Sequence, residues 1–286
     1  MVDWPLSSSQ DELTLQGELS MKVLVMCAGC FQEDGHPLNC HTAWHEVNDR
    51  GAYLTECPRG HKTVSVVQQH KFEILFELGA RALLDGYPGE AITRFASSQE
   101  RFFEFFIRVV AQRNQIAQAA MKQTWQDLVN SSERQYGAYL MLHLLHYGTS
   151  VSPKPEKVKP AGATGKTKDW KAFRNSVVHK GYIPSTEEAI QYGELVYDFI
   201  TSQVASSMST AGESVQTATM NLIMEAADSF RDVEGRRYNQ TMAIPGVVGV
   251  LAGTEVRSFR EALEQVRVMR STMDNLVTNL EHAKGA

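Results

Sequence analysis

Cysteine is absent from the chain after residue 57, and long hydrophobic runs are absent throughout. The most apolar stretch, residues 244–252, is short and is interrupted by Pro245, Gly246 and Gly249, so we expect no membrane-spanning helix. The first 20 residues are polar and acidic, whereas a secretory leader begins basic and continues apolar. These absences predict a cytoplasmic protein with no membrane partner and no disulfide bonds.

A surplus of positive charge is also missing, because the 286 residues carry a formal net charge of -5. The molecule as a whole does not present a cationic surface to polyanions, so any surface for nucleic acid has to be a local patch. With 43% hydrophobic residues, the chain is long and apolar enough to bury a sizeable core.

The cysteines lie close together in the sequence, which indicates a site. The first two follow a strand-like run at residues 21–26, and the last one stands with a histidine before another such run at residues 63–67. Turns of this spacing, each containing a glycine, are typical of knuckles that hold one tetrahedral zinc ion. Four protein ligands complete the coordination shell, so we expect a structural zinc and no cofactor for catalysis. The expected ligands are Cys27, Cys30, Cys57 and His61.

Other interpretations of this segment stay open. The same residues could be ordinary buried thiols beside an incidental histidine, although the paired spacing favours a metal site. A cysteine or histidine between the two turns could also replace one ligand, although we expect these residues to take no part. The residues concerned are His36, Cys40, His41 and His45.

After residue 70 the hydrophobic pattern changes from short strands to amphipathic helices. We expect a first helix from residue 71, a break at residues 85–89, an aromatic-rich second helix, and a third helix over about residues 123–147. The predicted fold class is therefore mainly α, with a small N-terminal β ribbon. The predicted divisions are a polar tail (1–20), a zinc-ribbon-like domain (21–70), a helical domain (71–205) and a C-terminal helical region (206–286).

Residues 148–169 are polar, rich in lysine and punctuated by proline. This composition predicts a flexible basic loop. Such a loop could follow a phosphate backbone, and with equal weight it could be a solvated connection. The candidate phosphate-binding lysines are Lys154, Lys157, Lys159, Lys166 and Lys168, together with Lys180 further along the chain.

Residues 170–184 are the most informative stretch of the chain. They have the pattern of a helix that ends at Gly181, a residue suited to the left-handed conformation past a helix end. Ser185 and Glu188 then have the spacing of a capping box that opens the next helix. His179 therefore lies in a last helical turn, where the negative end of the helix dipole favours the imidazolium form.

Arg174, its polar neighbour Asn175 and His179 form a pattern that resembles the HEPN superfamily, whose ribonuclease members share an arginine, an adjacent polar residue and a later histidine. Residues 79–87 and 98–104, in the preceding helix pair, are similar to the family too. The resemblance covers about residues 71–202, roughly half of the chain. It implies a HEPN-like helical bundle for this part of the protein.

The resemblance also implies an activity, because HEPN ribonucleases cut RNA without metal by driving the ribose 2′-hydroxyl onto the adjacent phosphorus. His179 would then move the proton, Arg174 would neutralise the developing negative charge, and Asn175 would orient the phosphate or the imidazole. Glu100 stands where the family often has an acid that contacts the arginine. Family habit further implies a toxin-like role in stress response or antiviral defence.

Arg174 and His179 are separated by about 140° on a regular helix, so one protomer presents them poorly to a single phosphate. Family members pair these helices across a two-fold axis, which implies a homodimer or higher homo-oligomer with a composite cleft. RNA is the expected partner, and a regulatory protein is a further one.

A second hypothesis is a non-catalytic HEPN-like module that binds a partner protein or nucleic acid. In that interpretation Arg174 pairs with a neighbouring acid and His179 caps a turn, without catalysis.

Overall fold

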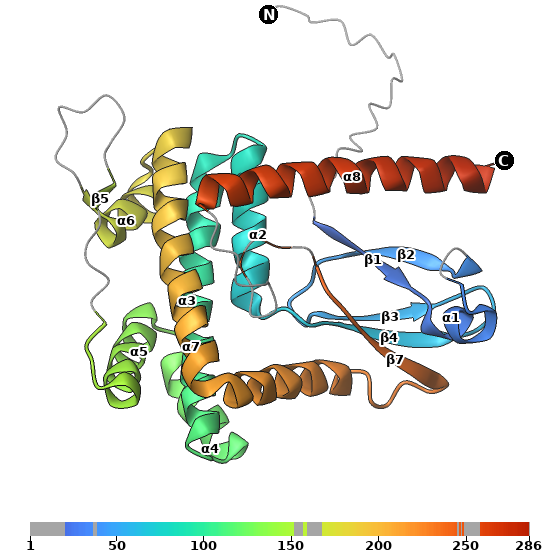
Figure 1. Cartoon of the computed structure of the whole chain (residues 1–286), viewed down its shortest axis with the longest axis horizontal. Coiled ribbons are helices and arrows are strands. Elements are labelled where there is room, and N and C mark those ends of the chain that lie inside the picture. The colour runs from blue at the N-terminus through green and yellow to red at the C-terminus, as the bar shows by residue number, and fades with distance from the viewer. Residues whose placement is uncertain are drawn as a thin grey trace, which may run out of the picture.

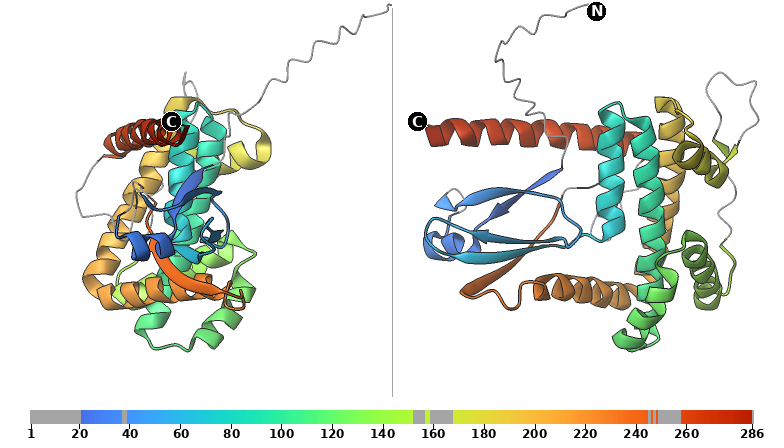
Figure 2. Two further views of the ribbon diagram at one scale, coloured as in Figure 1. Left: turned by 90° about the vertical axis from the view of Figure 1, so that its right-hand side faces the viewer. Right: turned by 180° about the vertical axis from the view of Figure 1, so that it is seen from behind.

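The computed structural model describes residues 21–36, 39–151, 157–158, 168–244, 246, 248 and 258–285. Helices form most of this part of the chain and gather at one end of the molecule, whereas the strands β1 to β4 and β7 lie at the other end (Figure 1). Two long helices, α7 (Thr186–Asp228) and α8 (Phe259–Gly285), extend from the helical end along opposite sides of the strands (Figure 2). The predicted class, mainly α with a small N-terminal β segment, is confirmed.

The first antiparallel pair of strands consists of β1 (Lys22–Met26) and β2 (Thr42–Glu46), and α1 (Ala28–Asp34) lies in the connection between them. Val23 and Val25 of β1 are buried in a small apolar cluster, and Leu24 between them is less buried. Side chains alternate between the two faces of a strand, so β1 buries one face and leaves the other partly open.

The second sheet has the strand order β3-β4-β7. β3 (Ala52–Glu56) and β4 (Lys62–Val67) form an antiparallel hairpin, and β7 (Arg236–Met242) pairs with β4 in parallel. Parallel neighbours need a crossover connection, and here most of the helical part of the chain lies between the two strands. The sequence predicted a C-terminal helical region over residues 206–286 and no strand within it, so β7 is a difference from that expectation.

The helical end is built around α2 (Lys71–Leu84) and α3 (Pro88–Arg113), which pack along each other. The break between these two helices falls within the predicted break at residues 85–89. Phenylalanine and tyrosine side chains from several helices fill its core, as the aromatic-rich sequence suggests. The remaining helices of this end pack around these two and around α7. These remaining helices are α4 (Gln118–Leu128), α5 (Ser132–Tyr147) and α6 (Trp170–Lys180).

The single helix expected over residues 123–147 is wrong, because α4 and α5 replace it. The Ser131 hydroxyl accepts a hydrogen bond from the backbone N–H of Arg134 and so caps the start of α5. The side-chain amide of Gln135 donates to the carbonyl of Val129 just past the end of α4, at 2.8 Å. These side-chain bonds satisfy backbone groups that an uninterrupted helix would satisfy internally.

The segment that precedes α6 contains two short strands, β5 (Lys157–Val158) and β6 (Lys168–Asp169), which pair antiparallel. The sequence predicted an irregular loop here, so this pairing is a difference from the expectation. The carboxylate of Asp169 accepts a hydrogen bond from the backbone N–H of Ala172 at 2.7 Å and caps α6. The hairpin and the cap together fix where α6 begins.

The predicted boundary between α6 and α7 is confirmed. Gly181 follows α6 with a φ of 67°, in the left-handed region that favours glycine. The Ser185 hydroxyl accepts from the backbone N–H of Glu188, and the Glu188 carboxylate accepts from the backbone N–H of Ser185, which completes the capping box. α7 continues for 43 residues, with non-helical dihedrals at Ala211. No helix in the described residues is long and apolar enough to cross a membrane.

The first residue of α8 belongs to the core of the helical end. The ring of Phe259 lies 5.7 Å, between centroids, from each of the rings of Phe76, Phe95 and Tyr197. Gly193 of α7 makes room for it, because a Cβ at this position would lie 2.6 Å from a ring carbon of Phe259. The C-terminal region is therefore anchored in the bundle by an aromatic side chain.

Replacing Gly193 with alanine is expected to lower the free energy of unfolding by about 1–3 kcal/mol, because the added methyl group overpacks this contact. The matched control is Gly137→Ala in α5, where a Cβ meets nothing within 4 Å. There the change is expected to raise stability by about 0.5–1 kcal/mol, since alanine favours the helix. Urea unfolding measures both, and equal effects of the two substitutions would contradict the packing argument.

Candidate functional site

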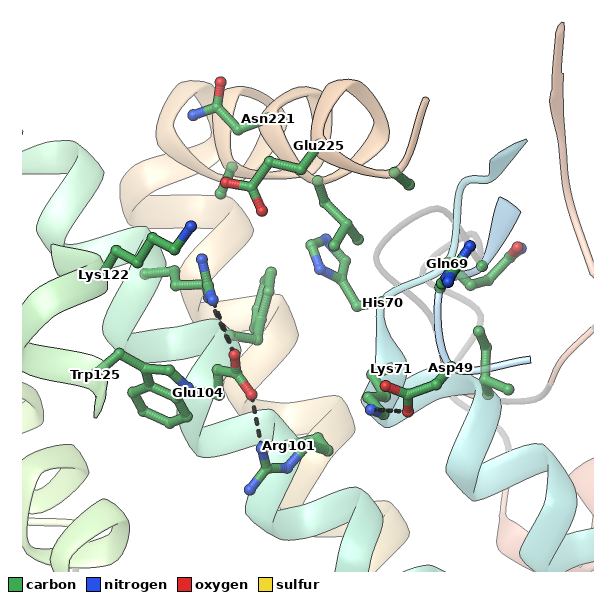
Figure 3. Close-up of a pocket in the computed structure, with 18 of the residues that line it drawn as sticks. Asp49, Gln69, His70, Lys71, Arg101, Glu104, Lys122, Trp125, Asn221 and Glu225 are labelled. Atoms are coloured by element: carbon green, nitrogen blue, oxygen red, sulfur yellow. Dashed lines mark hydrogen bonds and ion pairs between the residues drawn. The ribbon is translucent and has the colours of Figure 1, made fainter. Parts of the chain in front are cut away.

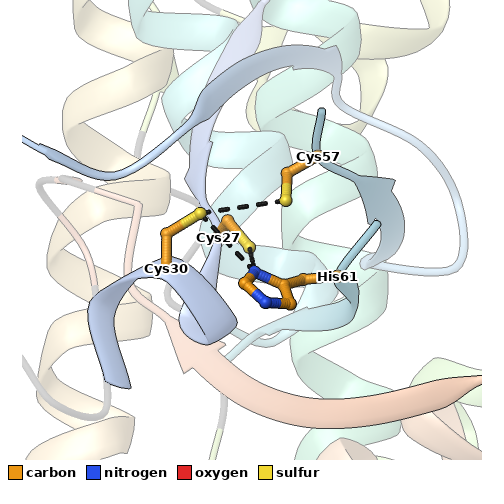
Figure 4. A group of neighbouring side chains, drawn as sticks. All are labelled: Cys27, Cys30, Cys57 and His61. Atoms are coloured by element: carbon orange, nitrogen blue, oxygen red, sulfur yellow. Dashed lines mark hydrogen bonds between the residues drawn. The ribbon is translucent and has the colours of Figure 1, made fainter. Parts of the chain in front are cut away.

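The four predicted metal ligands come together at the end of the strands that lies far from the helical bundle (Figures 1 and 4). Cys27 follows β1 and Cys30 lies in α1, while Cys57 and His61 occupy the turn between β3 and β4. One ligand atom from each residue lies within 4.8 Å of the others. The prediction that these residues meet is confirmed, and the group can bind a metal ion.

The distances inside this group suit one tetrahedral ion. Sγ of Cys30 lies 3.8 Å from Sγ of Cys57 and 3.6 Å from Nδ1 of His61, and Sγ of Cys27 lies 3.9 Å from the same nitrogen. Bonds of about 2.3 Å to sulfur and about 2.0–2.1 Å to nitrogen in a tetrahedron give ligand separations of about 3.8 Å and about 3.6 Å. The side chains therefore already have the spacing that such an ion requires.

Neighbouring charged residues hold the histidine in place. Nε2 of His61 lies 2.9 Å from Oε1 of Glu33, so a ring that binds metal through Nδ1 donates its other N–H to this carboxylate. Arg59 forms an ion pair with Asp34 at 2.7 Å beside it. Gly29 is required by space, since a Cβ there would lie 2.5 Å from Cγ of His61. This support is typical of the residues around a metal centre.

The thiols differ in how readily they ionise. Burial raises the pKa of Cys30 to about 11. Burial also opposes ionisation of Cys27, but hydrogen bonds from the Cys30 backbone and from the Thr63 hydroxyl outweigh it and lower the pKa to about 7. The thiolate is the form that binds metal, so Cys27 reaches its metal-binding form at a lower pH than Cys30 does. Cys40 is buried outside the group and donates to the carbonyl of His36 at 3.4 Å.

A second candidate site lies where α6 packs on α3. Nη2 of Arg174 is 3.0 Å from Oε1 of Glu100, and both side chains are about one quarter exposed, at 24% and 25%. Nη1 of the same guanidinium donates to Oδ1 of Asn175 at 3.2 Å. The predicted contact between Glu100 and Arg174 is therefore present. The pair holds a cationic group at the surface in a fixed orientation.

His179 is exposed in the last turn of α6, together with Lys180. Phe173 and Ser176 are buried and hold another part of the helix surface against the bundle. Arg174 and His179 belong to the same helix, but a regular helix turns by about 140° over five residues, so their side chains leave it in different directions.

Two further residues near Arg174, Tyr192 and Glu133, were not identified from the sequence. Tyr192 is fully buried, burial raises its pKa, and charges on Arg174 and Glu100 act on its hydroxyl, which has no hydrogen-bond partner in the described part of the chain. At the start of α5, a hydrogen bond from its own backbone N–H lowers the pKa of Glu133, and the charges of Lys171 and Arg174 lower it further. The position of Glu133 two residues after the Ser131 cap was the sequence signal that could have found it.

The candidate phosphate-binding lysines are only partly within the described structure. The exposed Lys180 lies beside His179. The β5–β6 hairpin brings the backbones of Lys157 and Lys168 together next to α6. Lys154, Lys159 and Lys166 lie outside the described residues.

Comparison of the chain with protein-family models, with curated proteins and with solved structures gave no match. The functional interpretation therefore depends on the residues of this chain.

Proposed function

We propose that the protein is a metal-independent endoribonuclease of the HEPN type. The observation that carries the proposal is the ion pair between Arg174 of α6 and Glu100 of α3. Arg174 lies on the same short helix as the exposed His179. An arginine fixed by a carboxylate, with a solvent-accessible histidine one turn further on, supplies the charge and the proton transfer that RNA cleavage needs.

In this mechanism the imidazole of His179 removes the proton from the ribose 2′-hydroxyl. The 2′-oxygen bonds to phosphorus, the bond from phosphorus to the 5′-oxygen breaks, and that oxygen takes the proton back from the imidazolium of the same His179. The guanidinium of Arg174 stabilises the negative charge on the pentacoordinate phosphorus, and Glu100 keeps the guanidinium in position. Asn175 holds the other side of the guanidinium and orients the phosphate. The products are a 2′,3′-cyclic phosphate and a 5′-hydroxyl.

Incubating the pure protein with labelled single-stranded RNA in EDTA tests this proposal. Cleavage is expected to proceed without metal in solution and to leave 2′,3′-cyclic phosphate ends, identified by mass spectrometry. The matching DNA strand is expected to stay intact, because it lacks the 2′-hydroxyl nucleophile. Products with 5′-phosphate ends that appear only with added magnesium would overturn the proposal.

The proposed enzyme acts as a homodimer, because Arg174 and His179 of one protomer point in different directions. Each cleft then combines Arg174 of one protomer with His179 of the other. The backbones of β5 and β6 lie beside α6. In this proposal the lysines of residues 154–168 guide the RNA backbone to the cleft. A regulatory protein partner would act by covering this surface.

Mixing two inactive variants is expected to restore activity. Random exchange of Arg174→Ala and His179→Ala protomers makes about half of the dimers hybrid, and each hybrid has one complete cleft. The RNA cleavage rate of the mixture should therefore rise well above that of either variant alone. A mixture as inactive as its components, combined with an active monomeric variant, would show that the cleft is not shared.

We also propose that the ion of the metal centre is structural zinc. A ligand set of three thiolates and one imidazole at tetrahedral spacing suits zinc and leaves no open position for water. The strands around it bury only small apolar clusters, so an ion adds stability that this part of the chain lacks on its own.

The second candidate function is a non-catalytic module that binds a partner. The observation in its favour is that Arg174 already has both Glu100 and Asn175 as partners, which is also what a purely structural arginine would show. Failure of the wild-type protein to cut RNA in EDTA, with RNA or protein binding retained, would favour this function.

A further inference from the structure

A cavity of about 950 Å³ lies where the two ends of the molecule meet. Its walls come from the turn between β2 and β3, from α2, α3 and α4, and from the second half of α7 (Figure 3). This volume is at the upper end of the range found for sites that bind small organic molecules. The candidate ribonuclease site is formed by other residues, so the cavity has no part in the proposed cleavage.

One part of the lining is apolar. Ile74 and Leu78 of α2, Phe105 of α3, Trp125 of α4 and Leu222 of α7 contribute to it. Phe105 and Trp125 are almost fully buried, so the aromatic side chains are fixed in the walls. A ligand that fills this space therefore has an apolar body, preferably a flat one.

The charged part of the lining is cationic. Six lysine and arginine side chains line the cavity against four aspartate and glutamate side chains, although the whole chain carries a net charge of -5. His70 adds no charge near neutral pH, because burial, together with the charge of Arg108, lowers its pKa to about 4. Its Nε2 lies 2.8 Å from the hydroxyl of Thr219. The formal net charge of the lining is therefore +2.

Some of these cations are fixed by neighbours. Glu104 lies between Arg101, at 2.8 Å, and Arg108, at 3.0 Å, as Figure 3 shows for the pair with Arg101. Arg101 also donates to Gln135 at 2.8 Å, and its guanidinium carbon lies 6.0 Å from the ring centroid of Trp125. These bonds hold the floor of the cavity rigid.

Other cations of the lining have no such partner. Arg50, Arg94 and Lys122 are exposed and make no ion pair within the part of the chain that the structure describes. In Figure 3, the side chains of Lys122 of α4 and Glu225 of α7, both in the lining, point toward each other. These three cations can attract an anionic ligand. They lie on different elements: Arg50 between β2 and β3, Arg94 in α3 and Lys122 in α4.

We propose that this cavity binds a small organic dianion with a flat apolar ring system, of the chemical class of a phosphorylated nucleoside. The phosphate is held by Lys122, Arg50 and Arg94 add positive charge to the lining, and the ring system fills the space beside Trp125 and Phe105. A phosphate monoester carries about -1.5 to -2 charges at neutral pH, which matches the excess positive charge of the lining. The ligand can be free or the end of an oligonucleotide, since both offer the same chemistry.

Calorimetric titration with AMP, adenosine and inorganic phosphate tests the proposal. AMP is expected to bind one site at least tenfold more tightly than either of the other two, because only AMP has both the charge and the ring system. A short RNA with a 5′-phosphate, compared with the same RNA without it, distinguishes an oligonucleotide end from a free nucleotide. Binding of phosphate or adenosine as tight as that of AMP, or no AMP binding at millimolar concentration, would overturn the proposal.

Two substitutions assign the binding to this cavity. Lys122→Glu is expected to weaken AMP binding at least tenfold, because it replaces an attraction by a repulsion. Glu225→Gln is expected to tighten binding several-fold, because it removes a negative charge that faces the ligand. The control is Gln123→Glu, an exposed position on the same helix that does not line the cavity. Equal affinities of the Lys122→Glu variant and the wild type would show that AMP binds elsewhere and would overturn the assignment.

Discussion

Replacing His179 with alanine is expected to lower the single-turnover rate of RNA cleavage by about a hundred-fold to ten-thousand-fold, because general acid–base catalysis contributes a factor of this size. The side chain is exposed at the end of α6, so its removal is not expected to change the stability of the fold. His36→Ala, at another exposed histidine, is the control and should cleave like the wild type. The rate is measured in EDTA with the RNA fully bound.

Arg174 provides a companion test of the same chemistry. Its replacement by lysine is expected to lower the rate by a similar factor, because one ammonium group cannot contact both Glu100 and a phosphate as a planar guanidinium does. Arg260, which pairs with Glu187 on the exposed surface, is a suitable control for an arginine-to-lysine change. Full activity of the Arg174→Lys and His179→Ala variants would refute the proposed mechanism and favour the interaction module.

Replacing Cys57 with serine is expected to abolish stoichiometric metal binding, so that the purified variant holds less than about a tenth of an equivalent of zinc. The wild type should hold one equivalent. Structural zinc contributes about 10–16 kcal/mol in isolated zinc-finger peptides, so loss of the ion should unfold the turn between β3 and β4. Elemental analysis and hydrogen exchange of residues 52–67 measure the two effects.

Cys40 offers a matched control for this experiment. It is a buried cysteine close to the centre but outside the ligand group, so Cys40→Ser should retain the metal. Glu33→Gln is expected to have an intermediate effect, a loss of about 10–100-fold in metal affinity, because Glu33 only orients His61. Loss of metal from Cys40→Ser with retention in Cys57→Ser would mean that the ligand set is wrong.

Local signals in the sequence were enough for the features that depend on neighbouring residues. The spacing of the cysteines and His61 identified the four residues that come together, because two tight turns fix where their side chains point. Gly181 and the Ser185–Glu188 capping box located the boundary between α6 and α7 for a similar reason. In each case the bonds that decide the structure lie within a few residues.

Features that depend on distant residues could not be read in this way. β7 has a polar sequence without apolar alternation, and it becomes a strand because the edge of β4 offers hydrogen bonds. The side-chain bonds of Ser131 and Gln135 divided the expected third helix, although its apolar periodicity was continuous. The Glu100–Arg174 contact was expected only from the family resemblance. The cavity is lined by residues from five separate segments, so no single stretch of the sequence predicts it.

The pairing of β4 with β7 also affects how the protein emerges from the ribosome. β4 is complete at Val67, but its parallel neighbour begins only at Arg236. Synthesis at about 5–20 residues per second leaves this edge without its partner for on the order of ten seconds. An unpaired strand edge is a template for aggregation. The β3–β4 hairpin, which carries Cys57 and His61, has to pass this interval before β7 covers the edge of β4. Early capture of the metal ion would keep the hairpin folded during that time.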